Sequence, residues 1–224
     1  MTESNVSHIH VLMDTSGSMQ NMQETAYTGV AELATVATDT VTISHFNHQL
    51  TIGEPQAVAD FSAACIRRQA SGTTALYDSI VTCVNHELAR SVTGLRTMVV
   101  LTDGMDTSSS VATAADAAKA LQDAKRAGID VKYVGANQSL EYATQLGIRE
   151  QDALVYDATN QGMYSGLVAV RRAVSSRTAD GSSAPFTVAE RAESMPNPFA
   201  DNGGALGARL DGPPRIVRQR SCMR

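Results

Sequence analysis

The chain has 224 residues, of which 43% are hydrophobic and 18% are charged, and its formal net charge at pH 7 is −5. This length suits one domain of ordinary size with an extension, and the composition excludes a chain that is disordered throughout. The acidic balance predicts no nucleic-acid partner, and no apolar run reaches transmembrane length.

Cysteine usage and the first residues indicate the compartment. Cys65, Cys83 and Cys222 are odd in number and lack CxxC spacing, which favours a reducing compartment over a closed disulfide framework. The stretch before Asp14 lacks the basic region and the long apolar run of a signal peptide. We therefore expect a cytoplasmic protein that does not bind membranes, and the sequence leaves its oligomeric state open.

The first half of the chain predicts strands that alternate with helices. We expect a strand over 8–13, a helix over 20–37, a strand over 40–46, a short antiparallel edge strand over 49–52, a short helix over 58–69 and a helix over 74–91. His8 and His10 share one face of the first strand. They could form a metal pair, but we favour packed histidines, because ligands gather at the opposite end of such a sheet. His45 and His48 are interpreted as turn residues.

The second half continues the alternation. We expect a strand over 96–102, a helix over 112–127 that ends at Gly128, a strand over 130–135, a short helix over 139–146, a strand over 153–156 and a helix over 160–176. Such alternation predicts an α/β fold with a mostly parallel central sheet and helices on both faces. Residues 1–177 form this predicted domain.

After residue 177 the composition changes. Five of the six prolines and five of the sixteen glycines lie in 178–224, and apolar residues there are sparse apart from a possible helix over 187–194. We expect a C-terminal extension that folds poorly alone and is flexible or ordered by a partner. Its last sixteen residues are net basic, with five arginines against Asp211.

Three short segments supply oxygen-bearing side chains. Asp14-Thr15-Ser16-Gly17-Ser18 follows the first strand, Ser71-Gly72-Thr73-Thr74 precedes a helix, and Leu101-Thr102-Asp103-Gly104 ends another strand. Carboxylates and hydroxyls are hard ligands that suit Mg²⁺, Mn²⁺ or Ca²⁺ rather than zinc. The sequence therefore predicts a divalent-cation site at the carboxyl edge of the sheet.

These segments resemble the von Willebrand factor A family. Its metal-ion-dependent adhesion site combines D-x-S-x-S, a loop threonine and a T-D-G aspartate, and all three parts are present here in the same order. The resemblance covers residues 7–176 and implies a Rossmann-like, doubly wound fold. The segment 133–138 is also similar to one in small bacterial and phage members, which implies an intracellular protein of bacterial or phage origin.

The resemblance implies both a ligand set and a function. Metal is expected at Asp14, Ser16, Ser18, Thr73 and Asp103, with Mg²⁺ as the expected ion and Mn²⁺ or Ca²⁺ as alternatives. A metal held this way keeps a position for a carboxylate from an Asp or Glu of a protein partner, so the expected function is non-catalytic, metal-dependent protein binding. One departure is Ser71, where family members often have glycine.

Other functions fit the sequence less well. A metal-dependent hydrolase remains an alternative; it would use the same carboxylates at the carboxyl edge of the sheet, which we call the acidic edge. A structural or assembly component with a vestigial metal site, of phage origin for example, is a further alternative. A dehalogenase-like phosphatase would need an acid at Ser16, and an aspartic protease would need a second D-T-G. G-x-S-x-G and Walker A patterns are absent. A receiver-like phosphoacceptor using Lys132 would need paired acids after the first strand.

Overall fold

The computed structural model describes residues 6–62, 67–136, 140–176 and 182–195. Its centre is a seven-stranded sheet in the order β3-β2-β1-β5-β6-β7, with β4 also paired to β2. The strands are β1 (Val6–Asp14), β2 (Ala37–Phe46), β3 (Leu50–Thr51), β4 (Gln56–Ala57), β5 (Arg96–Thr102), β6 (Ile129–Ala136) and β7 (Ala153–Tyr156). All pairings are parallel except those of β3 and β4 with β2.

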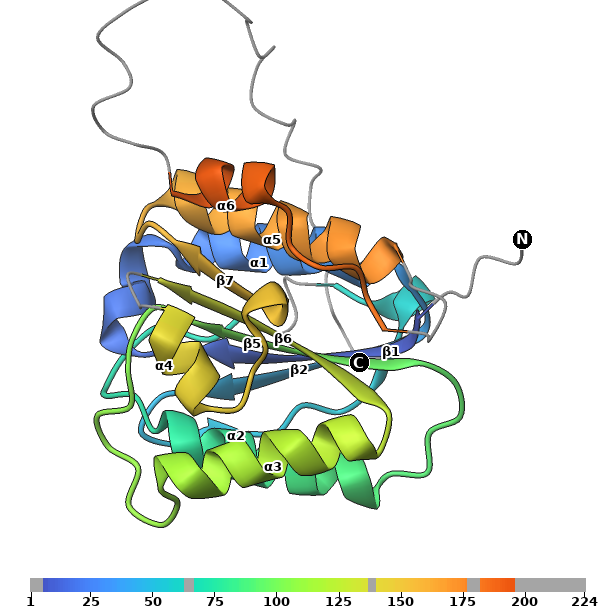
Figure 1. Ribbon diagram of the computed structural model, residues 1–224, viewed down its shortest axis with the longest axis horizontal. Helices are drawn as coiled ribbons and strands as arrows, with labels where there is room; N and C mark the ends of the chain where they lie inside the picture. The colour runs from blue at the N-terminus through green and yellow to red at the C-terminus, as the bar shows by residue number, and fades with distance from the viewer. Residues whose placement is uncertain (1–5, 63–66, 137–139, 177–181, 196–224) are drawn as a thin grey trace, which may run out of the picture.

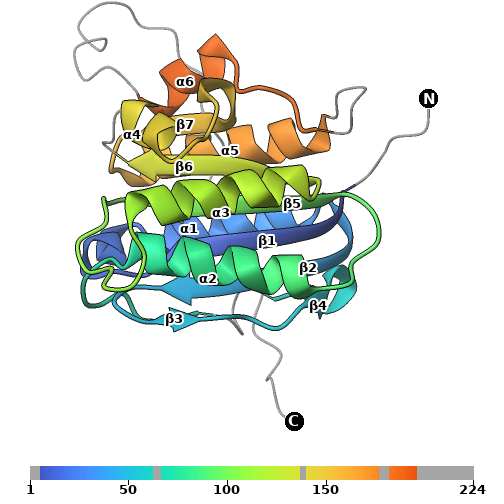
Figure 2. The same ribbon diagram turned by 60° about the horizontal axis from the view of Figure 1, so that its bottom comes forward.

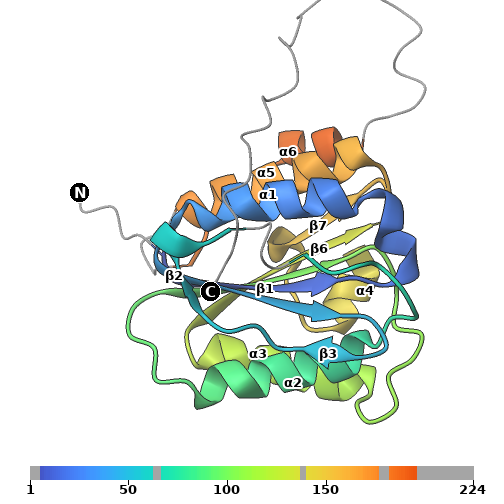
Figure 3. The same ribbon diagram turned by 180° about the vertical axis from the view of Figure 1, so that it is seen from behind.

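Helices cover both faces of the sheet (Figure 1). They are α1 (Gln23–Ala34), α2 (Leu76–Ala89), α3 (Ala114–Arg126), α4 (Leu140–Gln145), α5 (Asn160–Ser175) and α6 (Val188–Ser194), with 3₁₀ turns η1 (Gly17–Asn21), η2 (Val58–Asp60) and η4 (Glu150–Asp152). Helices α2 and α3 lie side by side on one face (Figure 2), and α1 and α5 lie side by side on the other (Figure 3). The predicted doubly wound α/β fold is confirmed.

The alternation of side chains along β1 divides the core in two. Ile9, Val11 and Met13 pack in the cluster beneath α1 and α5, whereas Leu12 packs in the cluster beneath α2 and α3. Both faces of this central strand are therefore buried, which explains its nearly continuous apolar sequence. None of the helices among the described residues is long and apolar enough to cross a membrane.

Two local predictions were wrong. The helix expected over 58–69 is reduced, in its described part, to the single turn η2, and Phe61 is already extended. Directly before this stretch β4 pairs with β2, and within it the Arg68 N–H donates to the Tyr27 hydroxyl. The first helix also ends before 37, because Ala37 begins β2, where it pairs with Val6. The expected start of α4 at 139 lies outside the described residues.

Residues 182–195 pack on the domain, although the sequence assigned them to the extension. Phe186 is buried in the core cluster beneath α1 and α5, and its N–H donates to the Gln151 carbonyl. Helix α6, which confirms the possible helix over 187–194, begins with a capping box between Thr187 and Glu190. Arg172 of α5 also pairs with Glu190 at 2.6 Å. The boundary at residue 177 stays a prediction, but this segment contributes to the core.

Candidate metal site

The first and third of the oxygen-bearing segments, after β1 and β5, meet where the order of the strands in the sheet reverses. From β1 the chain adds β2 and then β3 on one side, and it later adds β5, β6 and β7 on the other. Such a switch point leaves a crevice outside the carboxyl ends of the two central strands, where ligands of open α/β sheets bind. Asp14 is the last residue of β1, and Asp103 directly follows β5.

Asp14 is a fully buried carboxylate held in one orientation. Its Oδ1 accepts the Ser16 N–H at 2.7 Å, and its Oδ2 accepts the Thr102 hydroxyl at 2.7 Å. Burial raises the pKa of Asp14 to about 6, although these hydrogen bonds act to lower it and the neighbouring Asp103 acts to raise it. No salt bridge among the described residues reaches Asp14 or Asp103.

A chain of hydroxyls links the two carboxylates of the edge. The Ser16 and Ser18 hydroxyl oxygens are 3.1 Å apart, and Ser18 Oγ donates to Asp103 Oδ1 at 2.8 Å. Ser16 is buried, Asp103 is half-buried and Ser18 is exposed, so the group opens from the core towards solvent. Burial also raises the pKa of Asp103. Uncompensated acids with hydroxyls beside them are the hard donor set of a Mg²⁺-type ion.

Backbone hydrogen bonds join the first two segments. Gly17 donates its N–H to the Gly72 carbonyl at 3.0 Å, and Ser71 donates to the Thr15 carbonyl at 2.9 Å. Gly72 has a φ of 76°, and a Cβ there would collide with the His48 ring. Glycine is therefore strongly favoured at this position, chiefly by its positive φ and also by the nearby His48 ring.

The two threonines of the second segment lie in different surroundings. Thr73, the predicted ligand, is exposed, whereas the neighbouring Thr74 is buried at 5% exposure. A Cβ added to Gly104, directly after Asp103, would lie 3.7 Å from Thr74 Oγ1. The Thr74 hydroxyl thus faces the third segment. The sequence prediction of Thr73 as a ligand remains untested, and Thr74 was not among the predicted ligands.

The loop after β5 is joined to the start of α2. Asp106 Oδ1 accepts the Tyr77 N–H at 3.3 Å, and Asp78 accepts three successive N–H groups, those of Ser110, Val111 and Ala112. The carbonyl of Thr74 also accepts the N–H of Thr107 at 2.8 Å. Asp106 therefore holds the loop and caps the helix, so its carboxylate is already engaged.

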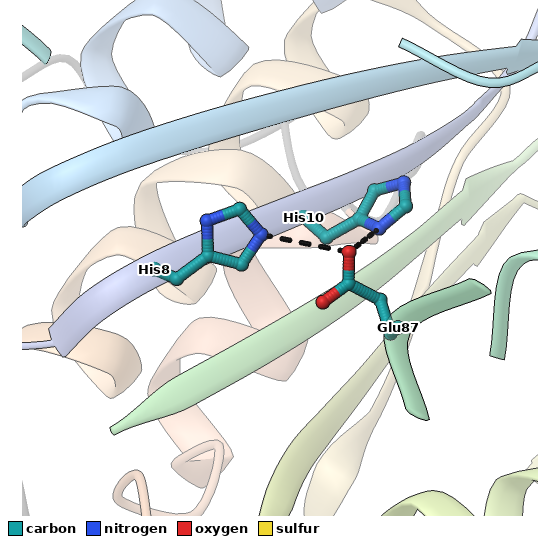
Figure 4. Close-up of side chains that lie close together, drawn as sticks. All are labelled: His8, His10 and Glu87. Atoms are coloured by element: carbon teal, nitrogen blue, oxygen red, sulfur yellow. Dashed lines mark hydrogen bonds and ion pairs between the residues drawn. The ribbon is translucent and has the colours of Figure 1, made fainter. Parts of the chain in front are cut away.

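A second polar group lies near the other end of β1 (Figure 4). His8 and His10 are both buried and meet Glu87 of α2, which is 1% exposed. Both histidines are packed in the interior, as expected, but burial does not decide between packing alone and the alternative of a metal pair, and no pattern in the sequence indicated Glu87 as their partner. His45, interpreted as a turn residue, is instead buried within β2, whereas His48 is exposed in the turn that follows it.

Lys132, the lysine that a receiver-like phosphoacceptor would use, is not at the acidic edge. It lies in the middle of β6, fully buried, with Nζ 2.6 Å from Asp152 Oδ1 and 5.4 Å from the centre of the Phe186 ring. Arg149 pairs with the other carboxylate oxygen of Asp152 at 2.6 Å. Lys132 is therefore part of the packing beneath the C-terminal segment.

The fold and the acidic edge together define an α/β domain with a candidate site for a hard divalent cation. No known family model matches the sequence, and no curated protein matches it. Solved structures do match it. The zinc-occupied form of proximal thread matrix protein 1 from the mussel byssus is similar at a TM-score of 0.62 and 15% identity, covering 75% of this chain and 48% of that one.

Two bacterial structures are similar to a comparable degree. The pilus adhesin SpaC of Lactobacillus rhamnosus GG has a TM-score of 0.64 at 13% identity, covering 76% of this chain and 31% of its own. A von Willebrand factor type A protein of Catenulispora acidiphila has a TM-score of 0.58 at 17% identity, covering 78% and 44%. The chain spans less than half of each of these three proteins. It contains a domain with the von Willebrand factor A fold.

Proposed function

We propose that this domain is a non-catalytic, metal-dependent protein-binding module. The observation that carries the proposal is the buried, uncompensated carboxylate of Asp14 at the switch point, joined through Ser16 and Ser18 to Asp103. A bound divalent cation would supply an open coordination position that attracts the carboxylate of a partner's Asp or Glu. Mg²⁺ is the proposed ion, with Mn²⁺ or Ca²⁺ as alternatives.

The residues present fit such an ion. Asp14, Ser16, Ser18 and Asp103 would hold it, and each lies on a segment that neighbouring hydrogen bonds fix in place. We propose Thr74 in place of Thr73 as the threonine ligand, because its hydroxyl faces Gly104. The comparisons support a bound metal in one respect: a structure of the similar mussel protein is described with a zinc-occupied MIDAS motif.

Metal-linked stability tests the site. A cation that binds only the folded chain should stabilise it by about 2.7 kcal/mol at a hundred times its dissociation constant. We expect Asp14→Ala to abolish this rise in melting temperature with Mg²⁺ or Mn²⁺, while the exposed control Asp39→Ala keeps it. A full metal-dependent shift in Asp14→Ala would place the site elsewhere. Thr74→Val and Thr73→Val decide between the two threonines in the same assay.

Partner binding and catalysis are separated by two further measurements. A pull-down with and without EDTA should show a partner that is retained only with metal, and an acidic residue on that partner should be essential. Purified protein with Mg²⁺ should hydrolyse neither phosphate esters nor peptides, because the Ser16 and Ser18 hydroxyls would be engaged by metal rather than free to attack. Turnover that Asp103→Ala removes would overturn the non-catalytic proposal. A cytoplasmic setting stays a prediction from the cysteines.

A further inference from the structure

The polar group formed by His8, His10 and Glu87 lies away from the acidic edge. In the parallel sheet, His10 precedes Asp14 by four residues and His8 precedes it by six, which places them about 13 Å and 20 Å along the strand. Glu87 comes from the last turn of α2, which covers this face of β1. The group is therefore separate from the proposed Mg²⁺ site and is unexplained by it.

Three possible ligand atoms converge within this group (Figure 4). Glu87 Oε1 lies 3.0 Å from His10 Nδ1 and 3.7 Å from His8 Nε2, and the three atoms all lie within 4.8 Å of one another. Ligands of a tetrahedral zinc ion stand about 3.4 Å apart, given metal–ligand distances of about 2.1 Å. The side chains are therefore gathered at nearly the spacing that such an ion needs, without a backbone rearrangement.

In each histidine, the ring nitrogen that does not face Glu87 is already hydrogen-bonded. His8 Nδ1 lies 2.7 Å from the Thr40 hydroxyl, and His10 Nε2 lies 2.7 Å from the Ser44 hydroxyl. Hydrogen bonds of this kind fix the ring orientation of metal-binding histidines and leave the other nitrogen for the ion. For His10 this requires the ring proton to move from Nδ1 to Nε2, where Ser44 Oγ can accept it, so no net proton is lost.

A cationic group now occupies the point where these atoms converge. Arg90 Nη1 lies 2.6 Å from Glu87 Oε1 and 2.9 Å from His8 Nε2. Arg90 directly follows α2, and its side chain is 19% exposed, against 1–2% for His8 and Glu87. The group therefore already holds a positive charge, and the side chain that supplies it is partly exposed to solvent.

A fourth candidate ligand atom stands beside the group without a hydrogen-bond partner. His86 Nδ1 is buried, makes no hydrogen bond within the described structure, and lies 4.0 Å from Glu87 Oε1. A buried polar atom without a partner costs free energy that a nearby ion could recover. His86 is 38% exposed at its side chain, so a change of rotamer could bring it to the ion.

We propose that His8, His10 and Glu87 form a second metal site, selective for a zinc-type transition ion that takes the place of the Arg90 guanidinium. Two imidazole nitrogens and one carboxylate oxygen suit Zn²⁺ or Co²⁺, whereas the hydroxyls and carboxylates of the acidic edge suit Mg²⁺. The two sites therefore differ in both position and metal preference. Arg90 competes with the ion, so its removal strengthens binding.

Zinc titration of the untagged full chain in excess Mg²⁺ tests this proposal. Arg90→Ala should bind Zn²⁺ at least tenfold more tightly than the wild type, and Co²⁺ bound to it should show the intense visible bands of a four-coordinate ion. Adding His8→Asn to Arg90→Ala should remove the tighter binding, whereas adding the exposed control His48→Asn should not.

The outcomes separate a metal site from a purely structural network. Equal zinc affinity in Arg90→Ala and wild type, or the weak spectrum of six-coordinate Co²⁺, would overturn the proposal. If the His8→Asn double variant fails to fold, the Co²⁺ spectrum of Arg90→Ala alone decides, because it reports the coordination directly.

Discussion

Replacing Phe186 with alanine tests whether the C-terminal segment belongs to the core. The ring is 5% exposed, packs in the cluster beneath α1 and α5, and lies over the buried ammonium of Lys132. Truncation of a buried phenylalanine costs about 3–5 kcal/mol, and we expect about 3 kcal/mol here, because a short segment near the end of the fold can partly close the cavity. For a domain of this size, that loss lowers the melting temperature by about 6–12 °C.

Urea denaturation followed by circular dichroism measures this loss. The matched control is Val188→Ala in the same segment, where the side chain is 85% exposed, and its free energy of unfolding should change by less than about 0.5 kcal/mol. A chain ending at residue 195 should match the full chain, whereas one ending at 177 should lose at least as much stability as Phe186→Ala. A loss below about 1 kcal/mol for Phe186→Ala would refute the assignment of this segment to the core.

A buried ion pair and a buried histidine lead to further predictions. Asp152→Ala should lower the free energy of unfolding, measured in urea, by about 3–5 kcal/mol, because it leaves the Lys132 ammonium buried without its carboxylate. Combining Lys132→Met with Asp152→Ala should cost less, because the buried charge is then removed as well. A loss below about 1 kcal/mol in Asp152→Ala alone would contradict this reasoning. Burial and the charge of Arg68 lower the pKa of His45 from 6.5 to about 4, so the unfolded chain binds a proton in this window that the folded chain does not. The free energy of unfolding should therefore fall by up to about 3 kcal/mol as the pH drops from 6.5 to 4. His45→Gln should flatten this part of a plot of melting temperature against pH. If the plot is unchanged in the variant, other groups cause the fall.

The sequence determined most of the fold because its signals are local. Apolar runs such as residues 8–13 and 98–101 predict strands buried on both faces, and their alternation with helical periodicity predicts a parallel sheet. The positions of Asp14 and Asp103 at strand ends then follow, because parallel strands bring their carboxyl ends to one edge. The local failure over 58–69 arises because a weak helical pattern is overridden by tertiary contacts, such as the hydrogen bond from the Arg68 N–H to the Tyr27 hydroxyl.

Only the tertiary structure decided which distant residues meet. Glu87 is 77 residues from His10, and it meets that ring because α2 crosses the face of β1 on which His8 and His10 lie. Phe186 joins the core beside Lys132 of β6, more than fifty residues earlier in the chain, and its N–H donates to the Gln151 carbonyl of η4. Thr74 faces the acidic edge, and Thr73 faces solvent, because hydrogen bonds to Thr107 and Gly17 orient the loop. Contacts of this kind depend on long-range packing, which cannot be inferred from periodicity or spacing along the chain.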